Sequence, residues 1–238
     1  IVLSCLGSGG MGAVFHAYDQ RLQVYRAIKV LKPELVSRQD VRQRFTREAI
    51  SMAQLNHPHV VQIFDYGQES LTMYIVMEYL PGNSLQSHLD SEGTLTKHQA
   101  LNVCLQVARG LKYIHDEGFV HRDIKPANIL LSSQGVKIAD FGLVRSDLDQ
   151  FKTHSAAVMG TFAFMSPEQR LGAKTVDLQT DIYALSASLY MMLTLENPID
   201  LHQDNDRVEA IAHLDLDIQN LINKGMHSDR SIRYSSCE

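Results

Sequence analysis

The sequence is poor in cysteine, in basic charge and in long apolar runs, and each shortage excludes a class of protein. Its three cysteines, in no metal-ligand spacing, argue against a disulfide framework or a zinc site and favour a reducing, intracellular setting. The net charge of -5 lacks the basic excess that general nucleic-acid binding requires. The longest apolar run, residues 182–195, is shorter than the roughly 20 residues of a membrane span, so it predicts a buried helix.

The remaining pattern changes from strand-like to helical near residue 81. Alternating apolar residues predict strands at residues 2–6, 13–18, 25–31, 60–64 and 73–78. One helix is predicted from an N-cap signature at Ser37 to about residue 55. After Pro81 the pattern is helical, with a capping box at Thr96 and Gln99 and a helix-ending Gly118. This order predicts an α+β fold of two lobes with a ligand cleft between them.

Residues 121–128 read His-Arg-Asp-Ile-Lys-Pro-Ala-Asn, and Asp140-Phe-Gly follows twelve residues after Asn128. The intervening residues 129–139 are mostly apolar and β-prone, so a tight hairpin is predicted that brings Asn128 and Asp140 together. The stretch then combines a carboxylate base, a cation and two oxygen ligands for a metal. Such a combination suits phosphoryl transfer, in which positioning and charge neutralisation provide most of the catalysis.

Residues 7–14 form a G-x-G-x-x-G-x-V loop between two predicted strands. Glycines allow the backbone to approach phosphate oxygens closely. A dinucleotide-binding turn shares the glycine spacing but opens a helix, and a simple hairpin turn would not need three spaced glycines. A Walker-type loop is absent from the sequence. The loop is therefore interpreted as a flap over nucleotide phosphates.

Lys29 and Glu48 are predicted to form an ion pair. Lys29 lies within an apolar strand pattern, and Glu48 shares the apolar face of its helix with Phe45 and Met52. A carboxylate on a core-facing stripe needs a cation, and the pair would orient the lysine toward the α- and β-phosphates. The alternative is an edge lysine with a solvated glutamate.

Together with Ser166-Pro167-Glu168, these motifs match the order and spacing of a eukaryotic-type (Hanks-type) Ser/Thr protein kinase domain, which the whole chain resembles. Gly-Gly-Met-Gly in the loop and Gln169 resemble bacterial members most. The resemblance implies a bilobal α+β fold. Its parts would be a small antiparallel β lobe with one key helix (1–77), a hinge (78–82) and a larger, mainly helical lobe (83–238) without its last helix. Two departures are Ser186, where the family usually has glycine, and a short, acidic segment at 198–214.

The resemblance also implies roles for single residues. Asp123 would accept the proton of the substrate hydroxyl, and Lys125 would neutralise the γ-phosphate. Lys29, held by Glu48, would contact the other phosphates. The residues expected to contact ATP are Leu6, Gly7, Ser8, Gly9, Gly10, Met11, Gly12, Ala13, Val14, Ala27, Lys29, Met77, Glu78, Tyr79 and Leu130.

Metal binding and regulation are implied in the same way. Asn128 and Asp140 would hold Mg²⁺, with Mn²⁺ as the alternative ion. Thr161 would shape the pocket for the substrate hydroxyl. Arg122 would receive a phosphate on the activation loop, where the candidate acceptors are Thr153 and Ser155, and the alternative is an unmodified polar loop. Structural roles are implied for a buried ion pair of Glu168 with Arg233, and for Asp181, which would cap the backbone of the catalytic loop (residues 121–128).

The resulting expectation is an ATP- and Mg²⁺-dependent protein serine/threonine kinase, activated by autophosphorylation. Its partners would be protein substrates rather than nucleic acid, and no oligomeric state is predicted. Because the chain starts inside a strand-like pattern, it is expected to be a fragment. It would be cytoplasmic, alone or as the cytoplasmic domain of a membrane-anchored protein. The main alternative is a catalytically silent pseudokinase that acts as a nucleotide-binding scaffold. A dinucleotide-dependent enzyme is disfavoured, because no parallel βαβ unit is predicted after the glycine loop.

Overall fold

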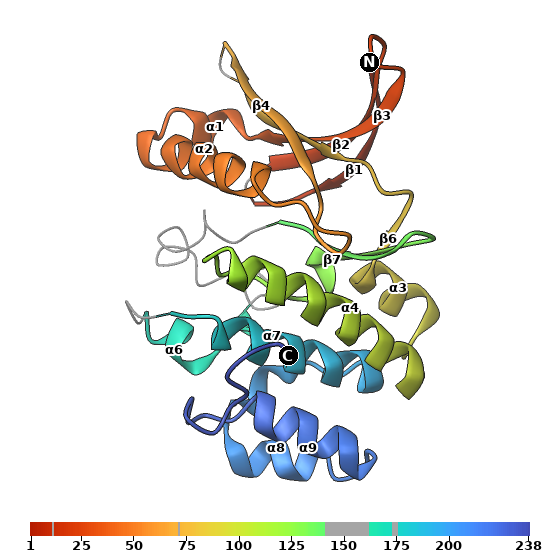
Figure 1. Ribbon diagram of the computed structural model, residues 1–238, viewed down its shortest axis with the longest axis vertical. Helices are drawn as coiled ribbons and strands as arrows, with labels where there is room; N and C mark the ends of the chain where they lie inside the picture. Colours follow the sequence, from red (N-terminus) through yellow and green to blue (C-terminus); the bar gives the residue numbers. More distant parts are fainter. Residues whose placement is uncertain (11, 71, 141–161, 173–175) are drawn as a thin grey trace. The chain divides into compact units, whose positions relative to one another are not determined.

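The computed structural model describes residues 1–10, 12–70, 72–140, 162–172 and 176–238, without the side chains at positions 44, 48 and 200. The chain divides into two compact units, Ile1–Pro81 and Gly82–Glu238. Figure 1 labels most of the elements of both. The first unit is built on strands with few helices, and the second is mainly helical, so the predicted α+β organisation is confirmed.

The first unit contains a five-stranded antiparallel sheet in the order β1-β2-β3-β5-β4. Its strands are β1 (Val2–Ser8), β2 (Gly12–Asp19), β3 (Val24–Leu31), β4 (Ile63–Glu69) and β5 (Thr72–Glu78). All five strands were predicted, although β4 starts and ends later than the sequence pattern indicated. Such antiparallel neighbours need only short connections. The one long connection, between β3 and β4, carries the helices of this unit.

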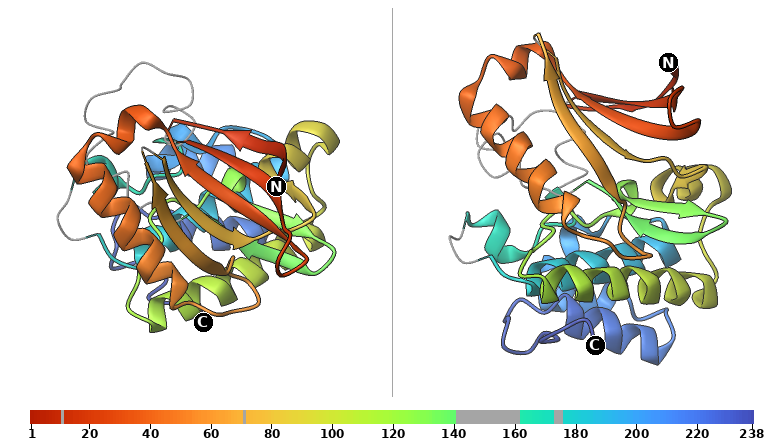
Figure 2. Two further views of the ribbon diagram at one scale, coloured as in Figure 1. Left: turned by 90° about the horizontal axis from the view of Figure 1, so that it is seen from above. Right: turned by 45° about the horizontal axis from the view of Figure 1, so that its top comes forward.

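Those helices are α1 (Pro33–Val36) and α2 (Gln39–Ala53). The apolar face of α2 is buried at helical spacing and includes Phe45 and Met52. In both views of Figure 2, α2 lies beside β4, which it contacts. The predicted N-cap at Ser37 is wrong. Pro33 starts a separate short helix, so Ser37 instead follows α1, and its Oγ donates to the carbonyl of Glu34 at 3.0 Å.

The second unit combines a three-stranded antiparallel sheet with several helices. Its longest helix begins at the predicted capping box, where Gln99 Oε1 accepts the N–H of Thr96 at 2.9 Å. Gly118 follows that helix with φ +80°, as predicted. The elements are β6 (Gly82–Ser84), β7 (Ile129–Ser132), β8 (Gly135–Ile138), α3 (Leu85–Glu92), α4 (Lys97–Asp116), η1 (Pro126–Asn128), α6 (Pro167–Arg170), α7 (Gln179–Thr194), η4 (Pro198–His202), α8 (Asp204–Ala210) and α9 (Leu216–Gly225).

The core of the second unit centres on α7, which packs against α4 and α9. Most of its residues are buried, as the apolar run at 182–195 predicted. Thr180 and Asp181 are buried at its first turn and bond to other segments of the unit. The first turn of α7 therefore holds the catalytic loop and the start of α6 (Pro167–Arg170) in place. Of the described helices, none has both the length and the apolar character that crossing a membrane requires.

Candidate active site

The predicted hairpin brings Asn128 and Asp140 to the same end of two paired strands. β7 and β8 pair antiparallel, with Ile129 opposite Ile138. The Ala139 N–H donates to the Asn128 carbonyl at 2.9 Å, which closes the open end of the hairpin. Asp140 follows with φ +55°, a left-handed conformation that aspartate tolerates better than most residues.

Asp123 has a carboxylate that is held by two neighbours on the same loop. Asn128 Nδ2 donates to Asp123 Oδ2 and to the Asp123 carbonyl, both at 2.8 Å. Lys125 Nζ lies 3.2 Å from Asp123 Oδ1 and 3.1 Å from Oδ2. Both charged residues are largely buried in this unit, each with 9% of its surface exposed. A carboxylate oriented in this way can accept a proton from a group that approaches its remaining lone pairs.

The donor set at the end of the hairpin fits a hard divalent cation. Both hydrogen bonds from the Asn128 side chain use its Nδ2 atom, which leaves Oδ1 as an acceptor. Asp140 supplies a carboxylate close by in the chain. Amide and carboxylate oxygens suit Mg²⁺, which keeps several waters or phosphate oxygens in its shell. The described residues contain no cluster of three or more His, Cys, Asp or Glu side chains that could form a metal centre of protein ligands alone.

The backbone of the catalytic loop is suspended from Asp181. Its Oδ2 accepts the N–H of His121 and its Oδ1 the N–H of Arg122, both at 2.8 Å. His115 Nε2 lies 2.9 Å from Asp181 Oδ2. Asp181 itself is fully buried, so these three partners replace the water that its carboxylate would otherwise need.

In the first unit, the sheet register places four predicted ATP contacts on one face. Val14 is opposite Lys29, and Ala27 is opposite Met77. Residues opposite each other, or two apart along a strand, project from the same side of a sheet. Val14, Ala27, Lys29 and Met77 therefore share a face of β2, β3 and β5.

The glycine loop joins β1 and β2, with Gly9 N–H donating to the Gly12 carbonyl at 2.8 Å. A Cβ on Gly12 would lie 1.9 Å from the Val30 carbonyl oxygen, so no other residue fits there. Cβ atoms on Gly7, Gly9 and Gly10 would meet nothing within 4 Å. Gly12 is thus required for packing, whereas the other three leave an open backbone that a phosphate could approach. Leu6, Ser8 and Ala13 belong to the flanking strands, and Met11 lies outside the described residues.

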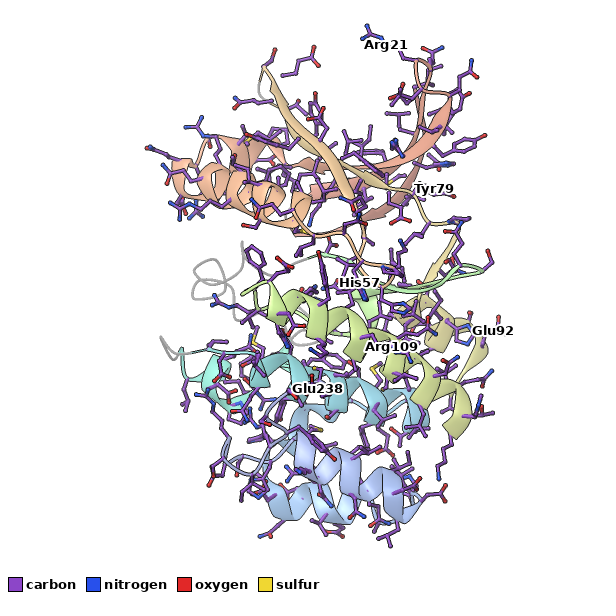
Figure 3. The ribbon with its side chains drawn as sticks, in the orientation of Figure 1. Arg21, His57, Tyr79, Glu92, Arg109 and Glu238 are labelled. Carbon is purple, nitrogen blue, oxygen red and sulfur yellow. The ribbon has the colours of Figure 1, made fainter. Side chains whose placement is uncertain are left out.

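At the end of β5, the Glu78 N–H donates to the Gln62 carbonyl at 2.8 Å and is not available to a ligand. Tyr79, labelled in Figure 3, stacks on His16 with ring centroids 3.9 Å apart. Sequence reasoning missed His16, although it is two residues after Val14 and thus on the same face. Leu130, the last predicted ATP contact, lies in β7.

Several predicted residues cannot be placed in full. Glu48 occupies α2 three residues after Phe45, but its side chain is outside the described atoms, as are all of Thr153, Ser155 and Thr161. Arg122 is exposed, and its guanidinium makes no ion pair with the described residues.

Glu168 and Arg233 form a bidentate ion pair within the second unit. Arg233 Nη1 and Nη2 donate to Glu168 Oε1 and Oε2 at 2.7 and 3.0 Å. Burial alone would raise the pKa of Glu168. The hydrogen bonds from Arg233, the backbone and Ser166, together with the charge of Arg233, outweigh it and lower the pKa below its ordinary value. The pair fixes α6 against the C-terminal segment of the unit.

One contact to the catalytic loop was not anticipated. Gln169 Nε2 donates to the Arg122 carbonyl at 3.0 Å. The Ser-Pro-Glu-Gln motif is a capping-box signal, which predicts a local bond between Gln169 and Ser166 but carries no information about a distant loop.

The chain matches the protein kinase domain family over residues 1–236. Serine/threonine-protein kinase PknB of Mycobacterium tuberculosis is 41% identical over 200 residues, which cover 81% of this chain and 32% of that protein. A protein of Clostridium perfringens named as a probable serine/threonine-protein kinase is 36% identical over 214 residues, covering 90% of this chain and 31% of that one. The chain thus spans about a third of the length of these relatives.

Among solved structures, the crystal structure of the Mycobacterium tuberculosis PknI kinase domain superposes with a TM-score of 0.78 and 27% identity. The match covers 99% of this chain and 91% of that domain. Fold, motif order and sequence identity agree over nearly the whole chain. The chain therefore belongs to the protein kinase family.

Proposed function

We propose that the chain transfers the γ-phosphate of ATP to serine or threonine hydroxyls of proteins. The observation that carries this proposal is the arrangement around Asp123, a carboxylate held by Asn128 and Lys125 beside the hairpin that joins Asn128 to Asp140. Its curated relatives named as serine/threonine-protein kinases support the same substrate class. They also support a bacterial origin.

Each residue has one proposed task in that reaction. Asp123 accepts the hydroxyl proton as the oxygen–phosphorus bond forms and the bond to the ADP leaving group breaks. Lys125 and Lys29 neutralise phosphate charge, and the glycine loop approaches the phosphates with its backbone. Asn128 and Asp140 hold the divalent cation, for which we propose Mg²⁺ rather than Mn²⁺, and which neutralises charge on the phosphate oxygens. Thr161 lines the pocket for the acceptor hydroxyl.

We further propose that residues 1–77, 78–82 and 83–238 are the N-lobe, hinge and C-lobe of one kinase domain. The boundary between the compact units, after Pro81, falls inside this hinge and supports it. A cytoplasmic location is proposed because ATP is available there and the three cysteines are free.

Activation by autophosphorylation at Thr153 or Ser155 is proposed as well. Its support is Arg122, an exposed guanidinium next to Asp123 without an ion-pair partner among the described residues. A phosphate there would gain charge-assisted hydrogen bonds from a side chain whose backbone is part of the catalytic loop.

The direct test is transfer of radiolabelled γ-phosphate from Mg-ATP to a generic protein substrate, followed by phosphoamino-acid analysis. We expect label on serine and threonine, and a fall in rate on the order of 10²- to 10⁴-fold for Asp123→Asn, because the general base is lost. Asp116→Asn, an exposed carboxylate that pairs with Lys112, is the matched control and should retain the wild-type rate.

Two results of this experiment would contradict the proposal. Equal rates for the wild type and Asp123→Asn would remove Asp123 from its role. Binding of ATP without any transfer, under several metals, would favour the scaffold alternative. Peptide mapping of the wild-type protein from the same reaction tests the activation proposal, which fails if the fully active protein carries no phosphate at residues 153 and 155.

A further inference from the structure

The residue before Asp123 has an unfavourable backbone conformation. Arg122 has φ +67°, in the left-handed region that a side chain with a Cβ rarely adopts. Such a residue costs on the order of 1 kcal/mol or more and persists only where its surroundings hold it. The direction of the Asp123 side chain depends on this turn, because the two residues share a peptide group.

The amide before this turn is held by Asp181. The Arg122 N–H donates to Asp181 Oδ1 at 2.8 Å, and the neighbouring His121 N–H donates to Oδ2 at 2.8 Å. This carboxylate belongs to the first turn of α7, the most buried helix of the unit. The peptide on the N-terminal side of Arg122 is therefore fixed to the core.

The peptide after the turn is held by α6. Gln169 Nε2 donates to the Arg122 carbonyl at 3.0 Å, and the N–H of the same peptide, that of Asp123, donates to His121 Nδ1 at 3.2 Å. The Gln169 amide has a defined orientation, because its Oε1 accepts the Ser166 N–H at 3.2 Å. With its oxygen facing a donor, its nitrogen must face the carbonyl of Arg122.

α6 is in turn fixed by its neighbours. Ser166 Oγ lies 3.0 Å from Thr180 Oγ1, and Glu168 is held by Arg233. Because α6 is held in place, the hydrogen bond from the Gln169 amide also holds the catalytic loop in place. Gln169, Arg122 and Asp123 also line one small surface depression.

We propose that Gln169 is a positioning residue for Asp123. By donating to the Arg122 carbonyl, it locks the peptide between Arg122 and Asp123 and keeps the carboxylate aligned for proton acceptance. The inference rests on the proposed kinase function and deepens it, because the side-chain hydrogen bonds of Gln169 to described residues go to Ser166 and Arg122, neither of which is assigned to ATP. A small displacement of a catalytic group can lower a rate by as much as 10²-fold, so one hydrogen bond at this point matters.

The decisive substitutions are Gln169→Glu and Gln169→Met. The first preserves side-chain length and the acceptor for Ser166 but replaces the donor with a carboxylate oxygen that faces a carbonyl. The second removes the donor without adding charge. For both we expect kcat to fall roughly 10-fold while KM for ATP stays within about twofold. Gln134→Glu, in the exposed turn between β7 and β8, is the matched control and should change neither parameter.

Two further readouts separate positioning from a merely structural role. In an Asp123→Asn background, Gln169→Glu should lower the residual rate little further, because Gln169 acts through Asp123. The rate of Gln169→Glu relative to wild type should also rise as pH falls from 6 toward the ordinary glutamate pKa of about 4.3, because the protonated carboxyl group can again donate to the Arg122 carbonyl.

Hydrogen–deuterium exchange makes the inference testable even if the chain transfers no phosphate. In Gln169→Glu and Gln169→Met, exchange at residues 119–126 should increase, while Gln134→Glu should resemble wild type. An inactive wild type would overturn the proposed function, but the exchange result would still decide whether Gln169 holds the loop. Unchanged exchange together with unchanged kcat in both variants would overturn the inference.

Discussion

His121 is a buried imidazole whose two nitrogens both form hydrogen bonds, one within the catalytic loop and one to the residue after β8. Its Nδ1 accepts the Asp123 N–H at 3.2 Å, so its proton is on Nε2, which donates to the Ala139 carbonyl at 3.1 Å. Only the neutral ring can make both bonds. Burial lowers the pKa of His121 below its ordinary value, although Asp181 and Asp123 oppose this effect. A proton on Nδ1 would break a contact that orients Asp123.

We therefore expect the protein to lose stability as pH falls through about 6.5. Below that value the unfolded chain binds a proton at His121 that the folded chain does not, so protonation favours unfolding. One such group contributes at most about 1.4 kcal/mol per pH unit to the free energy of unfolding. The loss begins near the pKa of the unfolded histidine and ends at the lower pKa of the folded one. Urea denaturation between pH 8 and 5.5 measures it.

His121→Gln has a side chain that can donate and accept but does not titrate. Its free energy of unfolding should therefore depend less steeply on pH than that of the wild type. His98→Gln, at an exposed position of α4, is the control and should retain the wild-type slope. Glu168 does not interfere, because the stability that its lowered pKa provides is present above the ordinary 4.5 and is lost only below it. The same slope for wild type and His121→Gln would show that His121 does not titrate in this way.

Among the elements of the second unit, α7 and α9 are in close contact at Ser186 and Gly225. A Cβ on Gly225 would lie 1.9 Å from Ser186 Oγ and 2.8 Å from Ser186 Cβ. The Ser186 hydroxyl donates to the Ile182 carbonyl at 2.9 Å and is not free to turn away without losing that bond. The contact gives a physical account of the departure noted at Ser186, since glycine at position 225 leaves room for the serine.

Gly225→Ala is expected to destabilise the protein by about 1–3 kcal/mol, because it overpacks this contact. Ser186→Gly by itself should cost about 0.5 kcal/mol through the loss of helix propensity. The double variant should be more stable than the sum of both costs predicts, because the missing serine side chain makes room for the new methyl group. Urea denaturation of the four proteins gives this coupling energy. Strict additivity would contradict the packing argument.

The ends of elements could be predicted where the signal comes from residues within one helical turn. They could not be predicted where another segment of the chain determines them. The capping box at Thr96 and Gln99 starts α4 as predicted, and Gly118 follows it. The N-cap prediction at Ser37 failed because Pro33 starts another helix first. The Gln169–Arg122 bond spans 47 residues and depends on the packing of α6, which no sequence pattern encodes.

For the whole molecule, motifs predicted the residue types of the candidate site and the two-part division of the fold. The short length of the connection between Asn128 and Asp140 and its β-prone residues were enough to predict the hairpin that joins them. The register that puts Val14, Ala27, Lys29 and Met77 on one face needs the pairing of three strands, two of them distant in sequence. Such pairing becomes defined only when the sheet forms.

Mg-ATP is proposed to bind the folded chain and not the unfolded one, so its binding should stabilise the fold. A ligand at 100 times its Kd adds about 2.7 kcal/mol to the free energy of unfolding, which differential scanning fluorimetry detects as a rise in Tm. EDTA should remove most of this rise, because Mg²⁺ links the phosphates to Asn128 and Asp140.

Asp140→Asn is the informative variant for this measurement. Asparagine tolerates the φ of +55° at this position as well as aspartate does, so the substitution does not strain the backbone, and each rise in Tm is measured from the variant's own ligand-free value. The variant loses the carboxylate charge that attracts the cation, so the rise in Tm with Mg-ATP should shrink markedly. Asp116→Asn should retain the full rise. A rise that is insensitive to both EDTA and Asp140→Asn would mean that the nucleotide binds without the proposed metal site.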